Sequence, residues 1–139
     1  MLLAIVFGGI YAYKNFAETG MTATADGASD KDNLIVVETP IPGAIVSSPL
    51  SVRGKARGSW YFEASFPIDL LAADGTVIGQ GHASAQGEWM TEEFVPFIGS
   101  IAFTAPIGGM KSGIVVFKKD NPSGLPENED SVSVPIQFP

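Results

Sequence analysis

Cysteine is absent from this chain of 139 residues. Its absence excludes disulfide bonds, thiolate metal sites and a cysteine nucleophile. It also excludes the lipid-modified cysteine of a bacterial lipoprotein. Because many exported bacterial domains lack disulfides as well, the missing cysteine does not identify a compartment.

Histidine occurs once, at His82, between Gly81 and Ala83. A catalytic triad or zinc site would have to be built around it, and a general base needs an orienting partner within reach. Ser84 and Asp69 could supply a hydroxyl and a carboxylate, but no motif places them beside His82. No phosphate-binding loop, dinucleotide-binding glycine pattern or G-x-S-x-G motif occurs. We therefore expect a non-catalytic protein without a cofactor, in which His82 is an ordinary surface or half-buried side chain.

Positive charge is scarce. The chain has 8 Lys and Arg against 15 Asp and Glu, which gives a formal net charge of −7 and a pI of about 4.5. Such a surface repels nucleic-acid phosphates and anionic lipid headgroups, so we expect no nucleic-acid partner. The hydrophobic content of 45% is enough for a packed core, and the length suits one domain with a tail.

Residues 1–16 begin with an apolar run, MLLAIVFGGIYAY, that carries no charge before Lys14. As a helix its thirteen residues span only ~20 Å, against about 30 Å for a bilayer core. Three interpretations stay open: a short membrane anchor, a signal peptide, or the second half of an anchor that begins upstream. A signal peptide should start with basic residues, which are missing, although Ala23-Thr24-Ala25 resembles a cleavage site. A buried element of a soluble domain is the fourth reading, and we favour export or anchoring over it.

Residues 17–33, AETGMTATADGASDKDN, are small, polar and slightly acidic. This composition is typical of a flexible tether, with a reach of roughly 20–25 Å. An apolar segment, a tether and then a folded domain is the order of a surface-displayed module. We therefore expect an extracytoplasmic protein, anchored to the cytoplasmic membrane by its N-terminal segment or secreted if that segment is cleaved.

From residue 34 to 139 the chain reads as short strands separated by turn residues. Leu50–Arg57 alternates strictly, with Leu50, Val52, Gly54 and Ala56 on the side expected to be buried. Asp74-Gly75 is a strong hairpin signal, and Pro67 indicates a bulge or edge position. Gly87-Glu88-Trp89 opens one further element, which Phe94–Phe97 closes. The other segments expected to form strands are Leu34–Glu38, Ala44–Val46, Phe62–Leu70, Thr76–Ala85, Ser100–Ala105, Ile114–Phe117 and Ser131–Phe138. We predict an all-β, immunoglobulin-like sandwich of about seven strands, with up-and-down or jelly-roll barrels as alternatives.

One run, PIPGAIVSSPLSVRGKA from Pro40 to Ala56, is more specific than the other strand signals. Together with Phe62-Glu63-Ala64, Asp74-Gly75, Gly87-Glu88-Trp89 and Pro135–Phe138, it resembles the immunoglobulin-like domain of bacterial spore-germination proteins, a domain associated with the GerMN domain. The resemblance covers about Leu34 to Pro139. It implies an immunoglobulin-like, non-catalytic, extracytoplasmic module of bacterial envelope proteins.

Aromatic residues are concentrated at Trp60-Tyr61-Phe62 and at Trp89. We expect Phe62 in the core, and Trp60 and Tyr61 exposed at a turn after Gly58-Ser59. Exposed aromatic rings beside polar groups suit a sugar or a peptide, so Trp60, Tyr61 and Trp89 are the candidate ligand-binding residues.

Charged residues gather at two places. Arg53, Lys55 and Arg57 form a basic stripe on one strand face, where cross-strand ion pairs, for example with Glu63, are expected. The acidic loop Asp120, Glu127, Glu129 and Asp130 is a weak Ca²⁺ candidate that lacks the EF-hand spacing. We favour a solvated loop and no metal there.

Two functional hypotheses follow. The first is a membrane-tethered, extracytoplasmic module that binds an envelope protein or polysaccharide. The second is a carbohydrate-binding module that uses the exposed aromatic residues. An enzyme built around His82 is a third and weaker hypothesis.

Overall fold

The computed structural model describes residues 31–105 and 107–139. The predicted anchor at 1–16 and most of the predicted linker at 17–33 lie outside the described residues. Leu34–Pro139 forms one compact unit. In the described part of the chain, no helix has the length and apolar character needed to cross a membrane.

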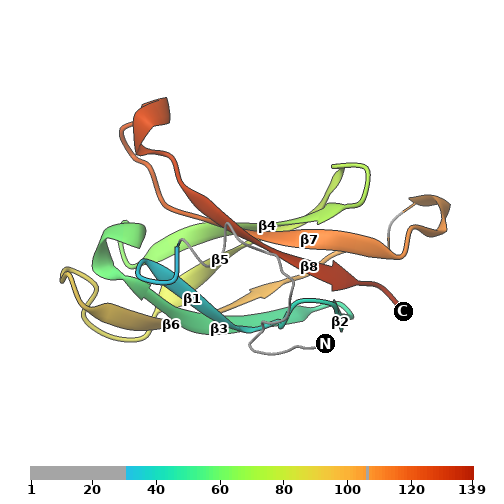
Figure 1. The fold of residues 1–139 in the computed structure, drawn as a ribbon, viewed down its shortest axis with the longest axis horizontal. Coiled ribbons are helices and arrows are strands. Elements are labelled where there is room, and N and C mark those ends of the chain that lie inside the picture. Colours follow the sequence, from blue (N-terminus) through green and yellow to red (C-terminus); the bar gives the residue numbers. More distant parts are fainter. Residues whose placement is uncertain (1–30, 106) are drawn as a thin grey trace, which may run out of the picture. The chain divides into compact units, whose positions relative to one another are not determined.

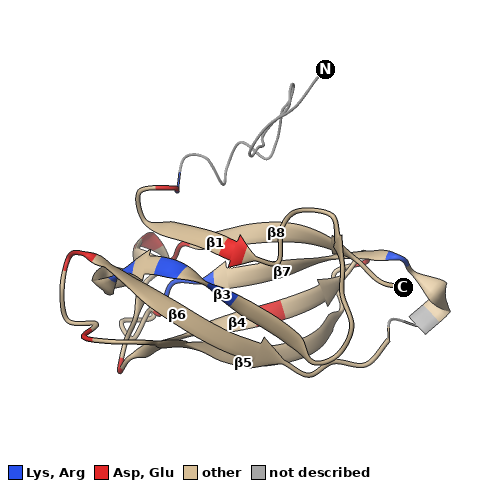
Figure 2. Ribbon diagram, turned by 90° about the horizontal axis from the view of Figure 1, so that it is seen from below, with Lys and Arg blue, Asp and Glu red and all other residues tan. Residues whose placement is uncertain are grey.

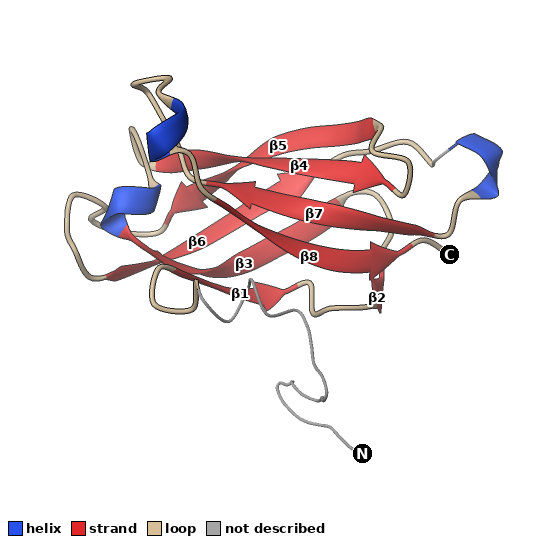
Figure 3. Cartoon of the chain, turned by 45° about the horizontal axis from the view of Figure 1, so that its top comes forward, coloured by secondary structure: helices blue, strands red, loops and turns tan. Residues whose placement is uncertain are grey.

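The compact unit is all-β, as the sequence predicts (Figures 1 and 3). The described residues contain no α-helix, only three 3₁₀ turns, η1 (Gly58–Trp60), η2 (Ile107–Gly109) and η3 (Pro126–Asn128). Its strands are β1 (Ile35–Thr39), β2 (Ala44–Ile45), β3 (Leu50–Arg57), β4 (Ser65–Ala72), β5 (Val77–Ala85), β6 (Phe94–Ile101), β7 (Ser112–Lys118) and β8 (Ser131–Gln137).

All eight strands belong to one sheet, in the order β1-β3-β6-β5-β4-β7-β8-β2. Every pair is antiparallel except β2 with β8. The two outermost strands follow each other in the chain, separated by Pro40, Pro42 and Gly43. Since proline cannot donate to a ladder, this segment ends the pairing of β1 with β3 and lets β2 pair at the opposite edge.

The sheet curls around its own core. The rings of Phe97 on β6 and Phe117 on β7 lie 6.0 Å apart, although β5 and β4 separate their strands in the sheet. In a flat sheet three strand spacings of about 4.8 Å would hold them ~14 Å apart. Strand β5 joins the two halves because it pairs with β4 along most of its length and with β6 at Ala83–Ala85. The described strands thus form one continuous curled sheet, and its hydrogen bonding does not by itself confirm the two separate sheets of the predicted sandwich.

Strand β3 has the predicted alternation, with buried Leu50, Val52, Gly54 and Ala56 on the core side. The aromatic ring beside Gly54 is that of Phe97, whose Cζ lies 2.9 Å from where a Cβ on Gly54 would be. Gly54 therefore permits the close contact between β3, β1 and the Phe97 ring.

The predicted Asp74-Gly75 turn joins β4 to β5. The Thr76 N–H donates to Oδ1 of Asp74 at 3.0 Å, and Gly75 has a φ of +89°. Pro67 lies where β4 pairs with β5 only, just before its pairing with β7 begins at Ile68. That is the edge position expected for this proline.

Two strand predictions need correction. Phe94–Phe97 and Ser100–Ala105 are not separate strands, because β6 runs unbroken from Phe94 to Ile101. Phe62 is not a core residue, since 42% of its surface is exposed. Glu63 and Ala64 have φ values of +51° and +68°, and this left-handed turn breaks the alternation that appeared to connect Phe62 to Phe66.

Candidate functional site

Trp60 and Tyr61, the predicted exposed aromatic residues, are buried, with 1% and 4% of their surfaces exposed. Turn η1 directs both side chains onto Phe66, at ring distances of 6.5 and 5.4 Å. The turn packs so tightly that a Cβ on Gly58 would overlap the carbonyl oxygens of Trp89 and Thr91. Because a buried ring cannot stack on a sugar, this geometry does not support the predicted ligand-binding role of Trp60 and Tyr61.

The two buried residues differ in how their polar atoms are satisfied. The Tyr61 hydroxyl donates to the Val95 carbonyl at 2.6 Å, and burial raises the pKa of the Tyr61 phenol well above its ordinary value. The Trp60 Nε1 has no acceptor among the described residues. Both side chains thus serve packing, and Trp60 does so with one unsatisfied donor.

A second aromatic pair, closer to the surface, joins Phe62, the residue after Tyr61, to Trp89. The rings of Phe62 and Trp89 lie 6.4 Å apart at 72°. Trp89 is half-buried, and its neighbour Met90 is exposed. Of the three predicted ligand-binding aromatics, only Trp89 reaches the surface, and Phe62 joins it in place of Trp60 and Tyr61.

The basic stripe on β3 faces outward and is ordered by its neighbours. The Arg57 guanidinium carbon lies 3.9 Å and the Lys55 Nζ 4.8 Å from the centre of the Phe94 ring. Arg53 pairs with Glu38 of β1 at 3.3 Å, so cross-strand ion pairing is confirmed with Glu38 in the place of Glu63. Figure 2 shows the blue bands of β3 beside the red band on β1.

Apolar side chains of β6 complete this surface. The register places Arg53 opposite Ile98, Lys55 opposite Pro96 and Arg57 opposite Phe94. Ile98 is 52% exposed, a large value for an isoleucine in a strand interior. We call the outer sides of Arg53, Lys55, Arg57, Phe94, Pro96 and Ile98 the cationic face.

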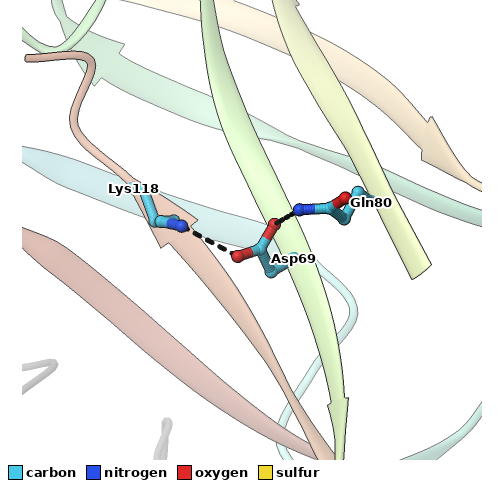
Figure 4. A network of polar contacts seen from close by, with 3 residues as sticks. All are labelled: Asp69, Gln80 and Lys118. Atoms are coloured by element: carbon cyan, nitrogen blue, oxygen red, sulfur yellow. Dashed lines mark hydrogen bonds and ion pairs between the residues drawn. The ribbon is translucent and has the colours of Figure 1, made fainter. Parts of the chain in front are cut away.

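On the opposite half of the sheet, Asp69 of β4 is held between two neighbouring strands (Figure 4). Lys118 of β7 donates to its Oδ2 at 2.8 Å, and Gln80 of β5 donates to Oδ1 at 3.3 Å. Both carboxylate oxygens of this buried group are therefore engaged. The arrangement explains how Asp69 tolerates burial.

His82 is exposed on β5, opposite Pro67. Asp69 is committed to Lys118 and Gln80, and Ser84 lies opposite Ser65. Within residues 31–105 and 107–139, the imidazole side chain of His82 makes no hydrogen bond or ion pair. The geometry does not assemble the acid, base and hydroxyl that a triad requires.

The acidic loop is ordered by amides and hydroxyls. Ser123 Oγ donates to Oδ1 of Asn121 at 2.6 Å and accepts from Nδ2 of Asn128 at 3.0 Å. Glu127 and Glu129 are exposed, and Oδ1 of Asp130 accepts the Ser131 N–H. Among the described residues, no group of three or more His, Asp or Glu side chains could hold a metal ion. Asp120, Glu127, Glu129 and Asp130 therefore do not converge into a Ca²⁺ site.

A family profile described as "Immunoglobulin-like domain of bacterial spore germination" matches residues 34–124. The chain belongs to this family. The match runs from the residue before β1 to the loop beyond β7, and it ends before β8, which pairs with β7 along its whole length. No curated protein and no solved structure shows significant similarity to the chain.

Membership of the spore-germination immunoglobulin-like family confirms the predicted resemblance. It supports a binding module in general terms, without naming a ligand. The cationic face is the functional candidate that sequence reasoning found only in part. The sequence shows the basic stripe but not its contact with Phe94. Phe94 lies 37 positions after Arg57, and strand pairing brings the two residues together.

Proposed function

We propose that this spore-germination immunoglobulin-like domain is a non-catalytic, extracytoplasmic binding module, tethered to the membrane by its N-terminal segment. It binds an acidic protein of the cell envelope through the cationic face. The observation that carries this proposal is the stacking of Lys55 and Arg57 on Phe94 beside the exposed Ile98.

The composition of the cationic face suits protein recognition. Arginine and aromatic residues are enriched at interfaces and dominate their binding energy. Stacking on Phe94 holds Arg57 and Lys55 in place, which reduces the entropy lost when a partner binds. In a chain with a net charge of −7, a local basic surface favours an acidic partner.

Charge reversal tests this function. The full chain carrying Lys55→Glu and Arg57→Glu should bind a cell-envelope fraction at least tenfold more weakly than the unaltered chain. The part of the binding that this variant loses should be the part that added salt also weakens, because salt screens surface charges. Lys119→Glu, at the far half of the sheet, is the matched control and should bind normally. Equal binding by both variants would exclude the cationic face.

The proposed tether is supported by the apolar run Met1–Tyr13 and by the polar composition of residues 17–33. Cell fractionation compares the full chain with a chain that lacks residues 1–16. The full chain should sediment with membranes and be accessible to protease from outside the cell. Recovery of both chains in the cytosolic fraction would contradict tethering and export.

Saccharide binding through the Phe62–Trp89 pair is the second candidate, favoured by the exposure of Phe62 and the partial exposure of Trp89. A glycan array probed with the full chain, its Trp89→Ala variant and its Phe62→Ala variant distinguishes the two functions. Binding that disappears in both variants supports this candidate. Saccharide binding lost in the Lys55→Glu, Arg57→Glu variant would instead assign it to the cationic face.

A further inference from the structure

The three basic side chains of the cationic face lean in opposite directions. The sheet order places β3 between β1 and β6. Arg53 reaches toward β1, where its Nε donates to Oε1 of Glu38 at 3.3 Å. Lys55 and Arg57 reach toward β6, where both lie over the Phe94 ring. The β6 side of the face is therefore covered by basic side chains at Phe94 and left open at its other end.

Ile98 lies at the open end of the face. The register places it directly opposite Arg53, but the Arg53 guanidinium is held on the β1 side. Ile98 consequently keeps 52% of its surface exposed, whereas Phe94 is only partly exposed beneath its two cations. Exposed isoleucine beside basic side chains suits an apolar side chain of an acidic partner, because burying that side chain adds affinity that charge alone does not supply.

Glu38 is directed at Arg53 by a bulge in β1. The register of β1 against β3 shifts between Val37 and Thr39, so Glu38 is an extra residue without a partner on β3. A bulge changes the direction of a side chain, and here the carboxylate meets Arg53. The two side chains are 50% and 64% exposed, so the pair adds little stability. Its main consequence is the direction in which Arg53 leans.

We propose that Ile98 is the apolar anchor of the cationic face, and that Glu38 is a positioning residue that keeps Ile98 open by drawing Arg53 toward β1. This role of Ile98 rests on the proposed function and specifies its partner, an acidic protein segment that also carries a large apolar side chain. Ile98 lies two and four residues along β6 from the positions opposite Lys55 and Arg57. The apolar group and the carboxylate of the partner should therefore lie about 7–13 Å apart.

The test uses two polymers as probes for the full chain, poly-L-glutamate and a random copolymer of L-glutamate and L-leucine. Both carry carboxylates, but only the copolymer offers apolar side chains, at every spacing from its charges. The unaltered chain should bind the copolymer about tenfold more tightly, as expected for one partly buried leucine. Ile98→Ser should reduce this preference to about twofold or less. The ratio of the two affinities isolates the apolar contact, because a change of charge on the protein alters both affinities alike.

Variants of the ion pair test the positioning role. Glu38→Gln releases Arg53 to lean over Ile98 and should lower the preference for the copolymer about two- to threefold. Combining Glu38→Gln with Arg53→Gln should restore the preference, since no guanidinium is left to cover Ile98. Glu127→Gln, on the exposed turn η3, makes the same change in net charge and should leave the preference unaltered. An unchanged preference in Glu38→Gln would overturn the positioning role.

A charge reversal separates failure of the anchor from failure of the cationic face. Lys55→Glu with Arg57→Glu should weaken the binding of both polymers, and equal binding by this variant and the unaltered chain would contradict the cationic face itself. If the reversal weakens both polymers but Ile98→Ser keeps the full preference for the copolymer, the anchor is wrong and the proposed function stands. Circular dichroism of each variant should match that of the unaltered chain, which excludes loss of folding as the cause of weaker binding.

Discussion

Lys118 Nζ lies 2.8 Å from Oδ2 of Asp69, and the two side chains differ in their access to water, with 46% and 12% exposed. This difference in exposure predicts that removing Lys118 and removing Asp69 lower the free energy of unfolding by unequal amounts. Lys118→Met leaves a buried carboxylate with Gln80 alone, whereas Asp69→Asn leaves an ammonium that can still reach water. After allowance for screening of the exposed ammonium, we expect losses of about 1–2 kcal/mol for Lys118→Met and below ~1 kcal/mol for Asp69→Asn.

Urea unfolding measures both variants of the Asp69–Lys118 pair, with Lys119→Met as the matched control for loss of a lysine at the same strand end. The control should stay within ~0.5 kcal/mol of the unaltered protein. A larger loss for Asp69→Asn than for Lys118→Met would show that the lysine does not compensate the buried carboxylate.

The burial of Tyr61 predicts that the stability of the folded protein falls at high pH. Its folded-state pKa is raised by burial, so its contribution to stability is fully present below the unfolded pKa of about 10 and is lost as the pH rises through the folded pKa. Near pH 7, Tyr61→Phe should cost about 1 kcal/mol through the lost hydrogen bond to Val95. Above pH 10 this difference in unfolding free energy should shrink by up to ~1.4 kcal/mol per pH unit.

Chemical unfolding of the unaltered chain and Tyr61→Phe between pH 7 and 11.5 provides the measurement. Taking the difference between the two proteins cancels the titration of the lysines and of the other tyrosines. A difference that stays constant across this range would mean that Tyr61 is not buried as described.

Gly54 should not tolerate a side chain. A methyl group there would overlap the Val36 carbonyl oxygen and lie 2.9 Å from Phe97 Cζ. We expect Gly54→Ala to lower the unfolding free energy by about 2–3 kcal/mol through overpacking between β1 and β3. Gly87→Ala, where a methyl group meets nothing within 4 Å, is the control and should be close to neutral. Similar thermal midpoints for the two variants would contradict the tight contact at Gly54.

The two tryptophans should differ in their contribution to stability. Trp60 is buried against Phe66, and Trp60→Ala should cost about 3–5 kcal/mol. Trp89 is half-buried beside exposed Phe62, so Trp89→Ala should cost less than ~1.5 kcal/mol. Denaturant unfolding followed by circular dichroism compares them, and equal losses would contradict the inward direction of turn η1.

Local patterns in the sequence predicted the strands well where one face of the strand is buried and the other is exposed to solvent. Leu50–Arg57 and Ser131–Phe138 have the expected alternation because burial on one side of a strand imposes a period of two. The prediction failed between Arg57 and Ser65. There a 3₁₀ turn and two left-handed residues, Glu63 and Ala64, rotate the aromatic side chains away from the faces that alternation assigns.

Neither candidate site could be read completely from the sequence, for a common reason. The cationic face depends on the pairing of Arg57 with Phe94, and an apolar cleft near the ends of β2 and β8 joins Val46, Phe103 and Phe138. These contacts are set by strand order and by the curl of the sheet. Strand order is a property of the whole chain, so single segments carry little information about it.

The central claim, that the cationic face binds an envelope protein, is tested most directly by photo-crosslinking in the cell that makes the protein. p-Benzoylphenylalanine replaces Ile98 in the cationic face or, as the control, Ser133, which is exposed on β8. We predict one discrete crosslinked protein from position 98, none from position 133, and loss of the product when Lys55→Glu and Arg57→Glu are added. The same products from both positions, or a product that survives the charge reversal, would contradict the account.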